Sequence, residues 1–109
     1  MTTAQLRLRL RMRMEYFETI AQETEGGIGL AVGSGNIEYR WKSEAIRSML
    51  RYLDQGLPLE DAKAKTKLDT REWIKNHNAK RPKDYQGWVR WEGSADDAIE
   101  QVCRDIHQS

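Results

Sequence analysis

The side chains best suited to acid–base, nucleophilic or metal chemistry in this chain are His77, His107 and Cys103. Both histidines lie in polar surroundings at the ends of expected helices, where a solvated imidazole is the simplest interpretation. Cys103 is expected to be a small buried thiol, because the acidic neighbours Glu100 and Asp105 oppose the positive potential that activates a thiolate. We therefore expect a non-enzymatic protein with no catalytic residue, no metal site and no cofactor.

Glycines between Gly26 and Gly33 could let backbone amides approach a phosphate. A dinucleotide-binding loop, however, opens directly into a helix, with an acidic residue about 20 positions further on. Here the glycines run into another strand-like segment, so the sequence favours a glycine-rich hairpin.

Length and composition indicate one domain over residues 1–109. The chain has 109 residues, of which 39% are hydrophobic and 32% charged, which is typical of a soluble globular protein. No apolar run approaches the roughly 18 residues that a spanning helix needs. A lone cysteine cannot form an internal disulfide, so we expect a cytoplasmic protein without a membrane anchor.

The net charge of +1 hides an uneven charge distribution. Residues 1–39 carry four basic and five acidic side chains, residues 40–83 carry twelve and six, and residues 84–109 carry two and six. A basic middle segment is typical of a surface for nucleic acid or an acidic partner, and equally of a solvated helix face.

Residues 6–14 alternate strictly between apolar and arginine side chains. Leu, Arg and Met are good helix formers, so propensity favours a helix. A strand, with its period of two, would instead place all the apolar side chains on one face and Arg7, Arg9, Arg11 and Arg13 on the other. We predict a strand here, because a helix would scatter both sets onto opposite sides.

Two further strands are expected at residues 28–32 and 37–41, joined by a Gly/Asn-rich hairpin, and another at residues 88–91. Helices are expected after Ser43, with Gly56 as the stop, then from Pro58, then from Asp69 or Thr70. A last helix should follow the capping box of Ser94 and Asp97. The predicted fold is thus α+β, a small antiparallel sheet packed against a helical cluster with a C-terminal helix.

The segment from Leu57 to Asn76 resembles the helix-turn-helix of DNA-binding proteins. It combines a short helix carrying the small residue Ala62, a break around Thr66 and Lys67, and a second helix with Trp73 and Ile74 packing inward. The usual turn glycine is replaced by Thr66 or Lys67. The resemblance covers about 20 residues and implies a recognition helix near residues 69–77.

That resemblance implies a set of contacts with double-stranded DNA. Thr70, Arg71, Lys75 and Asn76 would lie on the exposed side of the recognition helix, where Arg71 would pair with a guanine edge and Asn76 with adenine. Phosphates would be contacted by Lys63, Lys65, Lys67, Lys80, Arg81 and Lys83. The arginine row Arg7, Arg9, Arg11 and Arg13 could add a second phosphate-binding surface, or could protect a sheet edge from aggregation.

Two functions follow. The first is a small DNA-binding protein, such as a transcriptional regulator, which would act as a homodimer because one recognition helix reads too few base pairs. The alternative is a protein-binding inhibitor or adaptor, of the kind that viruses and mobile elements encode, which docks on a partner protein.

Overall fold

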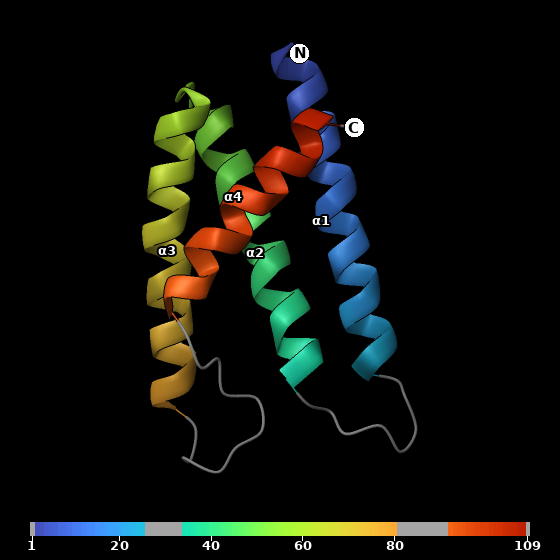
Figure 1. Ribbon diagram of the computed structural model, residues 1–109, viewed down its shortest axis with the longest axis vertical. Coiled ribbons are helices and arrows are strands. Elements are labelled where there is room, and N and C mark those ends of the chain that lie inside the picture. The colour runs from blue at the N-terminus through green and yellow to red at the C-terminus, as the bar shows by residue number, and fades with distance from the viewer. Residues whose placement is uncertain (1, 26–33, 81–91, 109) are drawn as a thin grey trace.

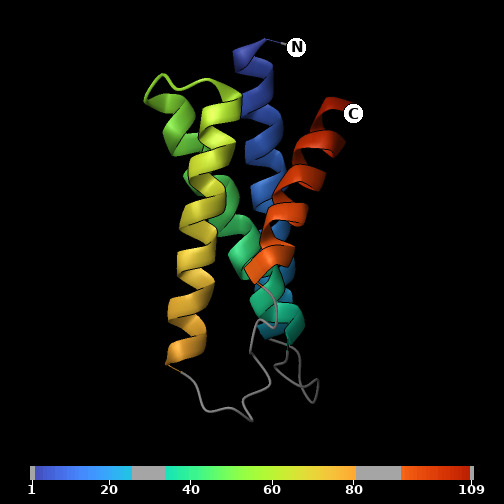
Figure 2. The ribbon, with the colours of Figure 1, turned by 60° about the vertical axis from the view of Figure 1, so that its left-hand side comes forward.

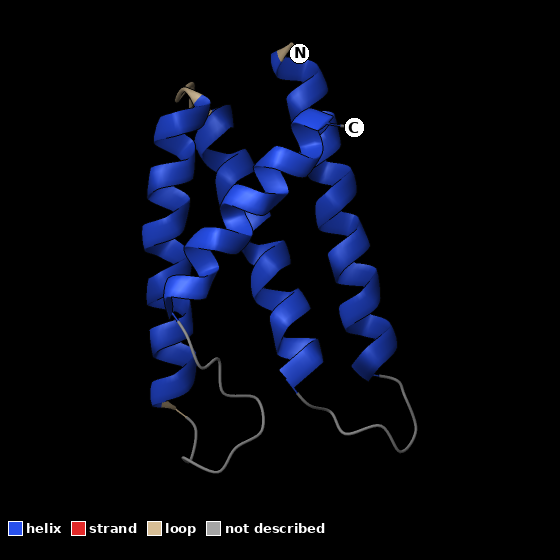
Figure 3. Cartoon of the chain, in the orientation of Figure 1, coloured by secondary structure: helices blue, strands red, loops and turns tan. Residues whose placement is uncertain are grey.

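Four helices make up the part of the chain that the computed structural model describes, namely residues 2–25, 34–80 and 92–108 (Figure 1). They are α1 (Thr3–Glu25), α2 (Ser34–Asp54), α3 (Leu59–Ala79) and α4 (Glu92–Gln108). Within these ranges there is no strand (Figure 3). The predicted α+β fold with an antiparallel sheet is therefore wrong, and the domain is an all-helical one.

Consecutive helices run in opposite directions, and α2 lies between α1 and α3 (Figure 1). The fourth helix crosses α2 diagonally, from the side of α3 toward the N-terminal half of α1 (Figure 1); Figure 2 shows the bundle after a 60° turn, with α4 beside α1. α2 contacts all three other helices, and its apolar residues form the centre of the main core. The expected core positions of α2 and α4 are indeed buried: Ala45, Ile46, Met49, Leu50, Leu53, Ala95, Ile99, Val102 and Ile106.

The predicted strand at residues 6–14 is a helix, because intrinsic propensity decides the outcome here. The strict alternation splits into two helical rows of residues four apart. Leu10 is fully buried, and Leu6 and Met14 pack against the same core. Leu8 and Met12, in the other row, are exposed to solvent. In a helix, the strictly alternating apolar residues therefore form one buried row and one exposed row.

The predicted strand at residues 37–41 is also wrong, because these residues belong to α2. Ser43 is accordingly no N-cap; it is buried within the helix, and its Oγ donates a 2.8 Å hydrogen bond to the carbonyl of Arg40. Gly56 does end the segment, with a φ of 91° that only glycine adopts easily. The strands expected at residues 28–32 and 88–91 lie outside the described residues.

The helix-turn-helix prediction is corrected by α3, which runs without a break from Leu59 to Ala79. No glycine or proline interrupts this segment, and acidic residues in its first turn favour the positive end of the helix dipole. Thr66, placed in the predicted turn, is fully buried, whereas Leu68 is exposed. The buried row of α3 repeats every four residues and consists mainly of small or polar side chains: Ala62, Thr66, Thr70, Ile74 and Asn78.

Candidate functional site

Two of the α3 lysines predicted to contact DNA phosphates, Lys63 and Lys67, are paired with α4 instead, whereas Lys65 lies over the ring of Tyr52. Lys67 Nζ lies 2.6 Å from Glu100 Oε1, and Lys63 Nζ lies 3.1 Å from Glu100 Oε2. Lys63 also lies 3.3 Å from Glu60, and only 11% of its side chain is exposed. Glu100 thus holds two cations of α3 against the acidic helix, which lowers the positive potential of this surface.

The pairing shifts the pKa values of Glu100 and Lys63 in opposite directions. Hydrogen bonds from Lys67 and Lys63 hold the pKa of Glu100 below its usual value. For Lys63, burial alone would lower the pKa, but hydrogen bonds to Glu100 and Glu60 outweigh it and raise the pKa above its usual value. Both groups are therefore charged at neutral pH, as a structural ion pair requires.

The residues predicted on the exposed side of the recognition helix have different surroundings in the structure. Arg71 forms a bidentate pair with Asp96 of α4, with 3.1 Å between Nε and Oδ1. Thr70 is buried against the bundle, so it cannot reach a groove. Lys75 and Asn76, together with Lys80 just after the helix, are exposed. Arg81 and Lys83 lie outside the described residues.

The four arginines near the N-terminus also differ in their surroundings: two bind backbone carbonyls of other helices, and two lie nearer to solvent. Arg7 Nη2 donates a 2.9 Å hydrogen bond to the carbonyl of Leu53, at the C-terminus of α2. Arg9 Nη1 donates a 2.8 Å hydrogen bond to the carbonyl of Ile106, near the end of α4. A cation that binds the last carbonyls of a helix stabilises the negative end of its dipole. These two arginines therefore have a structural role.

The other two arginines lie nearer to solvent. Arg13 lies over the ring of Tyr16, 5.9 Å from the ring centroid, and Arg11 is exposed. Neither belongs to an all-arginine face, because the residues of this segment wind around a helix.

The feature that most needs an explanation is the solvent side of α1, which carries a row of large apolar side chains. Leu8 is 57% exposed, Met12 60% and Tyr16 55%, and their spacing of four residues places them along one stripe of the helix. Gln5 and Thr19, both exposed and uncharged, continue this stripe toward the two ends of the helix. We call these five residues the outer face of α1.

Scattered apolar residues on a surface are ordinary, whereas a contiguous row is typical of a binding site. Among the described residues, the exposed large apolar side chains are those three and Leu68. Leu68 stands alone on α3 and serves as the isolated counterpart. The outer face of α1 is therefore the candidate functional site, and its chemistry is that of a surface for another protein.

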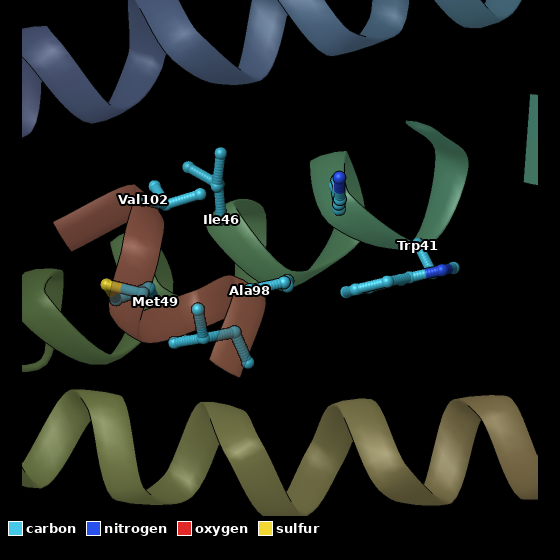
Figure 4. A pocket seen from close by; sticks show the side chains of 8 residues that line it. Trp41, Ile46, Met49, Ala98 and Val102 are labelled. Carbon is cyan, nitrogen blue, oxygen red and sulfur yellow. The ribbon is translucent and has the colours of Figure 1, made fainter. Parts of the chain in front are cut away.

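An apolar gap inside the bundle is too small to hold a ligand. This gap between α2 and α4 measures about 10 Å³, and its lining includes Trp41, Ile46, Met49, Ala98 and Val102 (Figure 4). That volume accommodates at most a single water molecule, so the gap is a packing defect.

A wider cleft of about 270 Å³ lies between α2 and α3. There Tyr52 donates its phenolic hydrogen to Asp69, which also lies 3.7 Å from Arg51. The hydrogen bond to Asp69, followed by burial, raises the pKa of Tyr52. A tyrosine that holds its proton more firmly is not suited to act as a general base.

Two of the side chains suited to acid–base or nucleophilic chemistry, Cys103 and His107, lie in the C-terminal half of α4. Burial raises the pKa of Cys103, so its thiol stays protonated. His107 Nδ1 donates to the carbonyl of Cys103 at 2.8 Å, an ordinary contact at the end of a helix. Within the described ranges no three His, Cys, Asp or Glu side chains gather as metal ligands, and no helix is long and apolar enough to cross a membrane.

The outer face of α1 was missed by the sequence analysis, although the information was present. A helix over residues 6–14 must leave half of the alternating apolar residues exposed. Exposure of this kind does not argue against a helix. It is instead the pattern of a helix with a second apolar surface.

Comparison with protein-family models, with curated proteins and with solved structures gives no match for this chain.

Proposed function

We propose that the chain is a non-enzymatic protein that acts by binding another protein chain through the outer face of α1. The observation that carries this proposal is the row of Leu8, Met12 and Tyr16, each more than half exposed on one stripe of a helix. Exposing such a row to water costs free energy, which burial against a partner would recover at about 25 cal/mol per Å².

DNA binding, the first function expected from the sequence, has lost much of its physical support. It required an outward-facing recognition helix and unpaired cations around it. Lys63, Lys67 and Arg71 are instead ion-paired with α4. Without a separate recognition helix, exposed Lys75, Asn76 and Lys80 are a small set of polar residues on a solvated helix end.

The cytoplasmic location stays part of the proposal, because the free thiol of Cys103 is buried in the core and suits a reducing compartment.

Photo-crosslinking tests the proposal on the full chain. Tyr16 is replaced by the photoreactive aromatic p-benzoylphenylalanine, and Leu68 is replaced in a matched control. We expect protein adducts from position 16 and none from position 68, and we expect Met12→Asp to abolish the adducts from position 16. Equal adducts from both positions, or adducts that survive Met12→Asp, would contradict the proposal.

A titration with random-sequence duplex DNA at low salt supplies the second test. We expect no retention of the duplex. Binding that weakens by orders of magnitude between about 50 and 200 mM salt, and that Lys75→Ala with Lys80→Ala reduces, would favour the DNA-binding function instead.

A further inference from the structure

The charges of α1 are separated along its length. Residues 1–14 contain four arginines and no acidic residue, and residues 15–25 contain four glutamates and no basic residue. A second copy of this helix packed in parallel would place arginines against arginines and glutamates against glutamates. An antiparallel copy places opposite charges together, and such complementarity selects both partner and orientation. Arg7, Arg9 and Glu18 bind groups of their own bundle, so the complementarity depends on the exposed charges beside the outer face, Arg11 and Glu15.

The outer face supplies a natural centre for an antiparallel pair. Met12 is the middle residue of the exposed row, and Leu8 and Tyr16 lie four residues to either side, about 6 Å along the helix axis. With a two-fold axis at Met12, Leu8 of each copy faces Tyr16 of the other, and the two Met12 side chains meet. Gln5 likewise faces Thr19, so no charge is placed on the midline.

One flank of this face supplies a charged pair, whereas the other flank carries Arg9 and Arg13, of which Arg9 is hydrogen-bonded to the carbonyl of Ile106. Arg11 and Glu15 are exposed and lie on the same side of the apolar row. In a two-fold antiparallel pair the same flanks of both helices adjoin. Arg11 of one copy and Glu15 of the other then differ by two residues along the axis, about 3 Å, which is within reach of an ion pair. Symmetry forms this pair twice.

We propose that the outer face of α1 binds a second copy of this chain, antiparallel, with Met12 at the two-fold axis. The inference rests on the proposed function, because it names the partner that the same face binds. What it adds is the register of the two helices, with Arg11 of one copy opposite Glu15 of the other. Reversing these charges tests that register.

The experiment is sedimentation velocity of the full chain from about 5 to about 500 µM, a range that reveals a micromolar dimer. Three variants are compared with the wild type: Arg11→Glu, Glu15→Arg, and the control Lys75→Glu on exposed α3. The first two are also mixed in equal amounts. Circular dichroism verifies that each remains helical.

We expect a concentration-dependent dimer for the wild type and for Lys75→Glu. Arg11→Glu alone and Glu15→Arg alone should each raise the Kd by about tenfold or more, because both cross-pairs become like-charged. Their mixture should form a heterodimer close to wild-type affinity, since both cross-pairs are then opposite in sign. A folding defect in either variant could not produce this rescue.

A wild type that stays monomeric over the whole range would overturn the inference, as would a mixture no tighter than its separate components. Should the chain stay monomeric while position 16 crosslinks to a different protein, the proposed function stands and only its partner changes. Co-sedimentation with vesicles of anionic phospholipid, lost in Met12→Asp, would make a lipid surface the occupant and would overturn both.

Discussion

Arg71 of α3 donates hydrogen bonds from both Nε and Nη2 to the carboxylate of Asp96 in α4. A guanidinium in this bidentate arrangement has the geometry that would otherwise suit a guanine edge. Here it joins two residues of different helices that are 25 positions apart in sequence. Together with the two lysines on Glu100, the pair shows what the basic middle segment does: it fastens the acidic C-terminal helix to the bundle.

Removing the charge of Glu100 should destabilise the fold. In Glu100→Gln the two lysines lose their shared partner, and Lys63, with an 11% exposed side chain, keeps a poorly solvated charge. We expect a loss of about 1–2 kcal/mol in the free energy of unfolding, measured by urea denaturation. Glu60→Gln is the matched control, because Glu60 is 80% exposed and pairs only weakly. Equal losses in both variants would show that the α3–α4 pairing contributes little.

The same cluster predicts how stability depends on pH. The folded-state pKa of Glu100 is lowered from its usual 4.5, so the stability it provides is complete above pH 4.5 and is lost as the pH falls below it. The pKa of Lys63 is raised from 10.5, so its contribution is complete below that value and is lost as the pH rises above it. Glu100→Gln should therefore flatten both limbs of a stability–pH curve. If the free energy of unfolding of Glu100→Gln changes with acid and alkaline pH as it does in the wild type, the cluster is not the cause of this pH dependence.

Tyr52 should ionise later than an exposed tyrosine. Its hydrogen bond to Asp69 raises its pKa from 10.0, so this contribution to stability is present below that pH and disappears above it. Asp69→Asn should bring the pKa back toward 10, as followed by phenolate absorbance, with Tyr52→Phe identifying the signal among the four tyrosines. An unchanged titration in Asp69→Asn would exclude the hydrogen bond as the cause.

Thr66 offers a site where a substitution should stabilise the protein. Its side chain is fully buried, and its Oγ1 finds no hydrogen-bond partner in the described structure. Thr66→Val keeps the shape and removes an unsatisfied hydroxyl, which should add about 1 kcal/mol to the free energy of unfolding. Thr66→Ser, which keeps the hydroxyl and loses a methyl group, should destabilise instead. A destabilised Thr66→Val protein would reveal a partner for the hydroxyl.

The helical apolar patterns of α2 and α4 were predictable, since positions such as Ile46 and Ile99 repeat at helical spacing and are buried as expected. The continuity of α3 was not predictable in this way. Its buried row contains the small polar residues Thr66 and Thr70, and such residues are also typical of a turn. For α1, burial does not choose between strand and helix when two opposite faces are apolar. The partners of Lys67 and Arg71 lie on a helix distant in sequence, so only the tertiary structure reveals them.

Disulfide trapping is the most direct test of the proposed antiparallel dimer through the outer face of α1. In a chain whose buried Cys103 is replaced by alanine, single cysteines are introduced as Met12→Cys and, at the equally exposed counterpart on α3, as Leu68→Cys. Oxidised glutathione is then added at a concentration where the wild type is dimeric. We expect a covalent dimer from position 12 that forms far faster than one from position 68. Equal rates at the two positions, or no covalent dimer from position 12, would contradict the proposed dimer.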